Sequence, residues 1–332
     1  MKRLLVLILL LAALWSGYWY VAQRGARTGF EAWFAARRAE GWQADYAALE
    51  IRGYPNRVDT TFENPVLADP ETGLAWEAPF FQIFALSYKP NHIIAVWPNS
   101  QTFSTPEAKY RISSADMRAS LVMHPGMKLP LERSNLVAQA LAVEAPGGTT
   151  TMEGVQFAIS RLEGSEQDYR IAFNTDGLTP PPPAHFRLET GGMLPGKLDA
   201  LRADATIRFD KPWDITALQD ARPQPRRIKL QLAEAKWGEL ALALAGTLDI
   251  DSEGRATGRI TVKARNWRDI IALIRQSGWL PDGWIDPVEE ALALAAQLSG
   301  NTQTLDVPLD FKGGTIRLGP LPIGPAPLFR LR

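Results

Sequence analysis

The chain has 332 residues, 46% of them apolar, and its 36 basic residues balance 36 acidic ones. This apolar share is enough for a folded core, and the balanced charge lacks the basic footprint with which proteins bind nucleic acid. The absence of cysteine excludes disulfides, thiolate metal sites and a cysteine nucleophile.

The first element is an uncharged run from Leu4 to Ala22, preceded by two basic residues. As a helix at ~1.5 Å per residue it is roughly 28 Å long, close to the ~30 Å hydrocarbon core of a bilayer. A cleaved signal peptide has a similar order of residues, but Tyr20 stands where cleavage before position 23 needs a small side chain. We favour an uncleaved transmembrane anchor at 4–22, with residues 1–3 as a cytoplasmic tail and the rest exported.

A juxtamembrane amphipathic helix is expected in segment 23–41. Thr28 and Glu31 form a T-x-x-E capping box that predicts the start of this helix, and Gly41 predicts its end. Phe30, Trp33 and Phe34 give it an aromatic stripe. The stripe either packs on the following domain or lies along the membrane surface as a collar.

Residues 42–185 are expected to form a first β-rich half. Turn signals rich in Gly, Pro and Asn recur at short intervals, and apolar residues alternate with polar ones in 155–159 and 169–173. Such strands form an antiparallel meander with one apolar face. The four-proline run at 180–183 then excludes helix interior and central strand.

Residues 186–332 are expected to form a second, similar half. Period-two alternation recurs in 228–232, 240–250 and 260–262, and two closing strands at 305–311 and 315–318 precede a proline-rich tail at 319–325. The Leu-Ala repeat in 239–245 is compatible with helix by propensity, but its period of two favours strand.

A helical pair is expected within 266–300. Trp267, Ile270, Ile271 and Ile274 follow helical spacing behind the cap Asn266, and Asp286-Pro287 opens a second helix. The pair should cover the apolar face of the sheet, or form a lid over a ligand groove. The expected fold class is therefore mainly β (α+β): one transmembrane helix, then a long curved antiparallel meander in two similar halves with a helical pair packed on it.

Catalytic and cofactor motifs are missing. The three histidines lie beside turn residues without metal-ligand spacing, and no nucleophile-elbow, P-loop or dinucleotide motif occurs. Asp249 to Gly254 imitates half of a calcium loop, but Ile260 stands where a bidentate glutamate is needed, so a hairpin turn is the better interpretation. We expect no enzymatic activity, no cofactor and no metal.

Two stretches carry a family resemblance: Glu50 to Pro65, reading EIRGYPNRVDTTFENP, and Ile316 to Gly324, reading IRLGPLPIG. They resemble domain-of-unknown-function family 2125, an uncharacterised family of membrane-anchored Gram-negative envelope proteins, over essentially the whole chain. The motifs are turns and strands, so the resemblance transfers no functional residue. The architecture is also distantly similar to AsmA-type envelope proteins, which implies lipid handling or outer-membrane assembly only by analogy.

These observations lead to one functional hypothesis and two alternatives. We expect an inner-membrane, single-pass protein of the periplasm whose curved sheet binds or shields a lipid or another apolar molecule. The expected apolar-ligand face consists of Leu240, Leu242, Leu244, Ile260, Val262 and Ile271. The same residues can instead form a closed core. The first alternative is an envelope scaffold that recruits a protein partner through a strand edge or the proline-rich tail. The second is an enzyme whose residues converge only in the fold.

Overall fold

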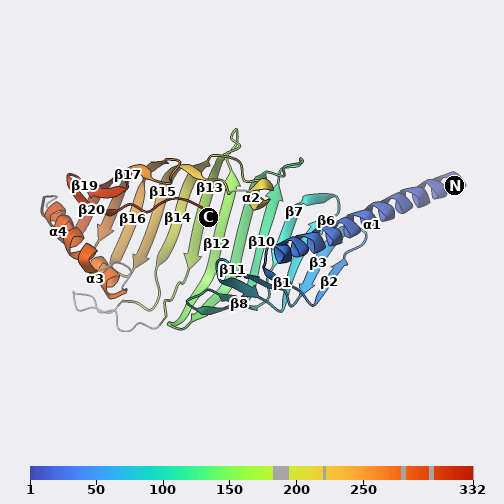
Figure 1. Ribbon diagram of the computed structural model, residues 1–332, viewed down its shortest axis with the longest axis horizontal. Coiled ribbons are helices and arrows are strands. Elements are labelled where there is room, and N and C mark those ends of the chain that lie inside the picture. Colours follow the sequence, from blue (N-terminus) through green and yellow to red (C-terminus); the bar gives the residue numbers. More distant parts are fainter. Residues whose placement is uncertain (182–193, 220–221, 278–281, 299–302, 332) are drawn as a thin grey trace. The chain divides into compact units, whose positions relative to one another are not determined.

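The computed structural model describes residues 1–181, 194–219, 222–277, 282–298 and 303–331 (Figure 1). The chain forms two compact units, residues 1–125 with 134–149 (unit 1) and residues 126–133 with 150–332 (unit 2). The structure is mostly antiparallel β-sheet with a long N-terminal helix, so the predicted fold class is confirmed. The predicted boundary between the two halves, at residue 185, lies outside the described residues.

Unit 1 consists of one helix and a set of short antiparallel strands. These are α1 (Lys2–Ala39), β1 (Gln43–Asp45), β2 (Ala48–Arg52), β3 (Arg57–Glu63), β4 (Val66–Asp69), β5 (Leu74–Glu77), β6 (Phe80–Leu86), β7 (Lys89–Val96), β8 (Ser100–Ser104), β9 (Lys109–Ser113), β10 (Asp116–Met123) and most of β11 (Leu131–Ala145). One ladder pairs β2, β3, β6, β7 and β10 in that order, and another pairs β1, β4, β5, β8, β9 and β11. Unit 1 therefore departs from a simple meander, because strands such as β3 and β6 pair across an intervening hairpin.

The helix α1 is continuous where the capping box predicts a new start at Thr28. It runs from Lys2 to Ala39 without a break, so the anchor and the juxtamembrane helix of segment 23–41 are one element. The segment contains no proline, and extending an existing helix fixes one residue per hydrogen bond, which is far easier than nucleating a new helix. The helix ends as predicted near Gly41, which has a φ of +90°.

The second half of α1 is held by the core of unit 1. Phe34 is 5% exposed and packs with Phe62 and Tyr46, and Phe30 packs against the same cluster. The aromatic stripe thus packs on the domain, which is the first of the two predicted alternatives. Figure 1 shows the N-terminal half of α1 projecting beyond the strands of this unit.

Unit 2 is a meander in which each strand from β12 to β20 pairs with the next. Its elements are β12 (Gly148–Arg161), β13 (Asp168–Asp176), β14 (Ala200–Phe209), α2 (Thr216–Gln219), β15 (Pro225–Trp237), β16 (Leu240–Ile250), β17 (Ala256–Arg265), α3 (Trp267–Ser277), α4 (Asp282–Leu298), β18 (Thr304–Lys312), β19 (Thr315–Leu318) and β20 (Leu321–Pro325). Every strand predicted by period-two alternation is present, and the Leu-Ala repeat is strand. The proline-rich tail at 319–325 forms a further strand, β20, which pairs with β19.

One face of this meander carries cross-strand ion pairs. They are Arg208 with Asp168, Arg170 with Asp204, Arg202 with Glu234, Arg227 with Asp249, Arg259 with Asp310 and Lys263 with Asp306. Exposed pairs contribute little stability individually, but they favour the register in which opposite charges meet. This face is the solvated one.

The opposite, apolar face is covered at β15–β19 by the protein's own chain. Trp267 and Ala296, from the helices α3 and α4 inserted between β17 and β18, form a buried cluster with residues of the sheet. Ile270 and Ile271 pack against this cluster, as predicted for a pair that covers the sheet.

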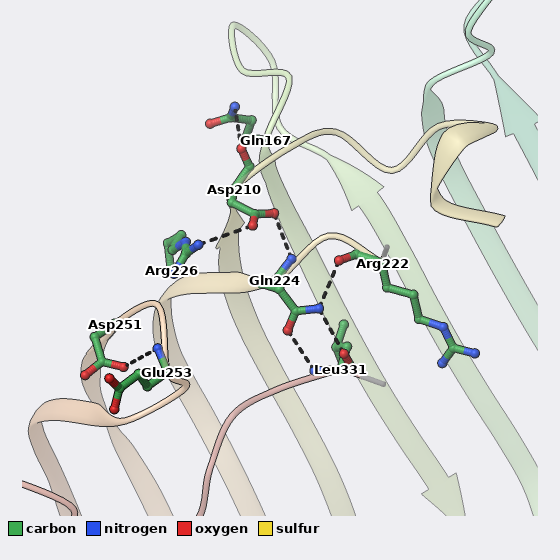
Figure 2. Close-up of polar contacts among 8 residues, drawn as sticks. All are labelled: Gln167, Asp210, Arg222, Gln224, Arg226, Asp251, Glu253 and Leu331. Carbon is green, nitrogen blue, oxygen red and sulfur yellow. Dashed lines mark hydrogen bonds and ion pairs between the residues drawn. The ribbon is translucent and has the colours of Figure 1, made fainter. Parts of the chain in front are cut away.

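The C-terminal segment covers a neighbouring part of this face. Ala326 and Phe329 pack on a cluster built around Leu248 and Ile260. Gln224 holds the segment through its side-chain amide, which donates to the Leu331 carbonyl and accepts from the Leu331 N–H, both at 2.9 Å (Figure 2). The last described residues are thus bound to the ends of the strands.

The turn between β16 and β17 is the hairpin predicted for 249–254. The Asp251 carboxylate accepts the N–H groups of Glu253 and Arg255 at 2.8 and 2.9 Å, and Figure 2 shows the first of these bonds. Hydrogen bonds to the charged form, first from Arg255, hold the pKa of Asp251 below its usual value. Its charge is used to close the turn.

Candidate apolar binding groove

A groove lies between the second half of α1 and the strands of unit 1. Its volume is about 660 Å³, within the ~300–1,000 Å³ typical of small-molecule sites. The residues that line it are Ala26, Gly29, Phe30, Trp33, Phe34, Phe62, Pro65, Leu67, Trp76, Phe81, Ile83 and Trp97. All belong to one compact unit, so the site is complete within unit 1.

The helical wall follows from the periodicity of α1. Ala26, Gly29, Phe30 and Trp33 are spaced at i, i+3, i+4 and i+7, which places them on one stripe of the helix. The wall is uneven because Gly29 has no side chain. A Cβ atom built there meets no heavy atom within 4 Å, so Gly29 leaves open space on this stripe.

The strand wall is aromatic and closely packed. Phe81 and Ile83 lie two residues apart in β6 and therefore face the same side of the sheet. The ring of Phe81 lies 5.8 Å from Trp76 and 5.2 Å from Trp97, centroid to centroid, and Phe30 meets Phe62 edge to face at 5.2 Å. Such contacts hold the rings in fixed positions.

The polar atom of Trp76, on the strand wall, is hydrogen-bonded outside the groove. The indole N–H of Trp76 donates to Oε1 of the buried Gln101 at 2.7 Å, and the amide of Gln101 contacts the sulfur of Met117 at 3.4 Å. Within the described part of the chain, none of the lining residues is ionisable. The groove can bind an apolar molecule, but its lining offers no acid, base or nucleophile.

A cation lies next to the groove and is neutralised. The guanidinium of Arg37 stacks 5.8 Å from the ring centroid of Trp33 and 5.7 Å from that of Trp42. It also forms an ion pair with Glu40 at 2.8 Å. Trp33 remains 44% exposed, so this part of the groove presents an apolar surface to its surroundings rather than a free charge.

The six residues predicted as the apolar-ligand face all lie in unit 2. Leu240 and Ile260 are buried. Leu244, Ile260 and Val262 belong to the cluster under the C-terminal segment, and Leu242, Val262 and Ile271 to the cluster under α3 and α4. The structure brings five of them into two clusters that share Val262, and both clusters are covered by the chain itself.

The groove was not found by sequence reasoning, although one of its walls was. The aromatic stripe of 30–34 is visible as helical periodicity. The other wall comes from four strands and two loops spread over residues 62–97, and no local pattern shows that these converge on α1.

Perturbed carboxylates occur far from the groove in sequence, on the charged face of unit 2. Hydrogen bonding to Arg208 lowers the pKa of Asp168, and hydrogen bonding to Arg170 lowers that of Asp204. Each is explained by its own ion pair. Among the described residues, no three His, Asp or Glu side chains are grouped so as to hold a metal ion.

Comparison with protein families shows which family the chain matches. The family described as an uncharacterized protein conserved in bacteria, DUF2125, matches residues 19–327. The chain belongs to this family. Comparison with curated proteins and with solved structures finds no significant match, and so gives no support to the AsmA-type resemblance. The N-terminal helix of this family member is long and apolar enough to span a membrane, and its most apolar stretch is not buried in the protein.

Proposed function

We propose that this protein is a non-enzymatic envelope protein, anchored in the inner membrane by α1, that binds an apolar chain such as a lipid acyl chain in the groove of unit 1. One observation carries the proposal. The helix that supplies the membrane-length apolar run also supplies one wall of an open groove whose described lining lacks ionisable groups. An exported position of both units, in the periplasm, follows from the expectation that a long domain after such an anchor is translocated.

The proposed ligand is apolar because of what the groove can offer it. Each methylene buried from water contributes about 0.8 kcal/mol, so an acyl chain gains affinity from length alone. Among the residues that the structure describes, the lining includes no cation that would select a carboxylate or phosphate. We therefore place recognition in the chain of the ligand and not in a headgroup.

The scaffold alternative has less support. Part of the proline-rich tail is already paired as β20, and Leu331 is bound by Gln224. A partner that used this tail for strand addition would first have to release it, which costs the hydrogen bonds already made.

The proposal is tested with the full chain in lipid nanodiscs and a palmitic acid analogue that carries a diazirine near its methyl end. Illumination should attach the analogue to the strand wall, at Trp76, Phe81 or Trp97, mapped by mass spectrometry of the peptides. Gly29→Leu fills the open space beside the ligand and should reduce this labelling about tenfold, the effect of ~1.4 kcal/mol of lost binding. Labelling confined to residues 4–22 would contradict binding in the groove.

Gly25→Leu is the matched control. Gly25 lies one helical turn before Gly29, does not line the groove and also has open space around its Cβ position. Gly25→Leu therefore adds the same side chain to the same helix without occupying the groove. Labelling of the strand wall should therefore be unchanged in Gly25→Leu, and a loss equal to that of Gly29→Leu would assign the effect to the helix and not to the groove.

A further inference from the structure

Two loops of unit 1 are bonded to the apolar half of α1. The indole N–H groups of Trp15 and Trp19 donate to the carbonyls of Pro55 and Arg57, at 3.0 and 2.7 Å. The hydroxyl of Ser16 bonds to that of Tyr54 at 2.8 Å. The hydroxyl of Tyr18 donates to the carbonyl of Ser87. The bonds to Pro55 and Tyr54 reach the loop between β2 and β3, the bond to Arg57 reaches the first residue of β3, and the bond to Ser87 reaches the loop between β6 and β7.

These bonds lie inside the run that is long enough to span a membrane. If both loops stayed above the bilayer, only Leu4 to Leu14 would remain for the hydrocarbon. That segment is about 16 Å long at ~1.5 Å per residue, roughly half of the ~30 Å required, and two basic residues precede it. A span of ordinary length therefore carries residues 15–19, and the loops bonded to them, into the membrane.

The geometry points to a membrane-embedded tip: the loops 53–57 and 87–88 lie within the interfacial layer of the bilayer, packed around α1. This inference rests on the proposed membrane anchoring and adds a second contact, made by the β-rich domain itself. Its partner is the lipid surface.

The backbone of the tip is suited to this position. Polar backbone groups that lack partners are costly in a membrane. Here the carbonyls of Pro55, Arg57 and Ser87 accept the side-chain bonds from α1, and the carbonyl of Asn56 accepts the Ser87 N–H at 2.9 Å. The donors are Trp and Tyr side chains, which themselves favour the membrane interface.

Two tyrosines lie on the outer surface of the tip. Tyr54 is 59% exposed and Tyr88 57% exposed, one in each loop. The ring of Tyr54 also meets that of Trp19 edge to face at 5.4 Å, so the exposed tyrosine continues the aromatic band of the helix. Lys89 lies exposed next to Tyr88, where an ammonium group can reach the phosphates of the headgroups.

The position of the tip also determines how far the groove lies from the membrane. Ala26 and Trp33 follow Trp19 by about 10 and 20 Å along the helix at ~1.5 Å per residue. With Trp19 in the interface, the groove begins just beyond the headgroups, within reach of a lipid chain that leaves the bilayer.

The experiment places a fluorophore in the tip of the full chain. The sequence has no cysteine, so Asn56→Cys and Tyr88→Cys each provide a single site for an NBD label. Nanodiscs contain phosphatidylcholine with a nitroxide either near the headgroup end or near the methyl end of an acyl chain. Both tip labels should be quenched, more strongly by the shallow nitroxide.

Two further labels separate the possible outcomes. Leu74→Cys is exposed in the same unit, at the start of β5 and two residues from Trp76 of the groove wall, which faces a part of α1 beyond the tip, and it should not be quenched. Leu7→Cys lies within the apolar run and should be quenched by the deep nitroxide. Quenching of Leu7 without the tip labels overturns the embedded tip and leaves the anchor standing. No quenching at Leu7 overturns the anchor on which both proposals rest.

Discussion

Filling the groove should make the protein more stable, which is the opposite of what most substitutions do. Gly29 lies inside a long helix, where glycine is about 0.8–1.0 kcal/mol less favourable than alanine and leucine is nearly as good as alanine. The Cβ position of Gly29 is open and borders an apolar groove, so a leucine there buries its side chain without a clash. The perturbation is therefore Gly29→Leu.

The size of the effect follows from two terms. Helix propensity contributes about 0.6–0.8 kcal/mol, and burial of a leucine side chain contributes up to ~1.5–3 kcal/mol if it is complete. Because the groove is open on one side, we take about half of the second term and expect ~1.5–2 kcal/mol in total. In Gly25→Leu only the propensity term acts, so the difference between the two variants, about 1 kcal/mol, measures the groove.

Thermal unfolding of the full chain in nanodiscs, followed by circular dichroism, measures this difference. For a unit of this size 1 kcal/mol shifts Tm by roughly 2–4 °C, so Gly29→Leu should melt ~4–7 °C above the original protein and ~2–4 °C above Gly25→Leu. Added fatty acid should raise the Tm of Gly25→Leu more than that of Gly29→Leu, because the stabilisation by a ligand decreases as its affinity for the folded protein decreases. A lower Tm for Gly29→Leu would refute the open groove.

Three other predictions concern unit 2. Ile271→Asp places a charge in the cluster under α3 and α4 and should destabilise the protein by about 2–4 kcal/mol in urea unfolding; no loss of stability would mean that the pair does not contribute to the core. Gly258→Ala should lower the free energy of unfolding by at least ~1–3 kcal/mol, because Gly258 has a φ of +146° and the added Cβ would lie 2.3 Å from a carbonyl oxygen. Gly126→Ala is the control: Gly126 has a φ of +147° and open space, so this change adds backbone strain without the clash. Arg208→Gln should make the free energy of unfolding decrease less steeply as the pH falls. The pKa of Asp168 is lowered in the folded state, so the Asp168 carboxylate stabilises the fold above its unfolded pKa of ~4, and this stabilisation is lost as the pH falls through the lower folded pKa. Equal urea midpoints for Arg208→Gln and the original protein at every pH would contradict this assignment.

The sequence alone determined most of the secondary structure of unit 2. Alternation in 228–232, 240–250 and 260–262 predicted β15, β16 and β17, and helical spacing behind Asn266 predicted α3. The second helix was also predicted, but its start was wrong: α4 begins at Asp282, four residues before the predicted cap Asp286, so Pro287 lies inside the helix. These signals are local, because a side chain in a strand or helix faces one side at a fixed period whatever lies across from it. The family was also recognisable from turn and strand motifs, which the match over 19–327 confirms.

Only the tertiary structure decided where one element continues into the next. The capping box at Thr28 is a valid local start signal, but α1 enters it already helical, and propagation needs no new nucleus. The same holds for the tail: Leu321 to Pro325 has little strand propensity, yet β19 offers an unpaired edge that these residues complete.

The candidate site depended on tertiary structure most of all. The apolar residues of β16 and β17 were visible in the sequence, but α3, α4 and Phe329 cover them, while the open groove combines Gly29 of α1 with Trp76 and Trp97 of strands and loops far along the chain. Periodicity shows that a face is apolar. Which part of the chain covers that face, and which part leaves it open, depends on long-range packing that no local pattern encodes.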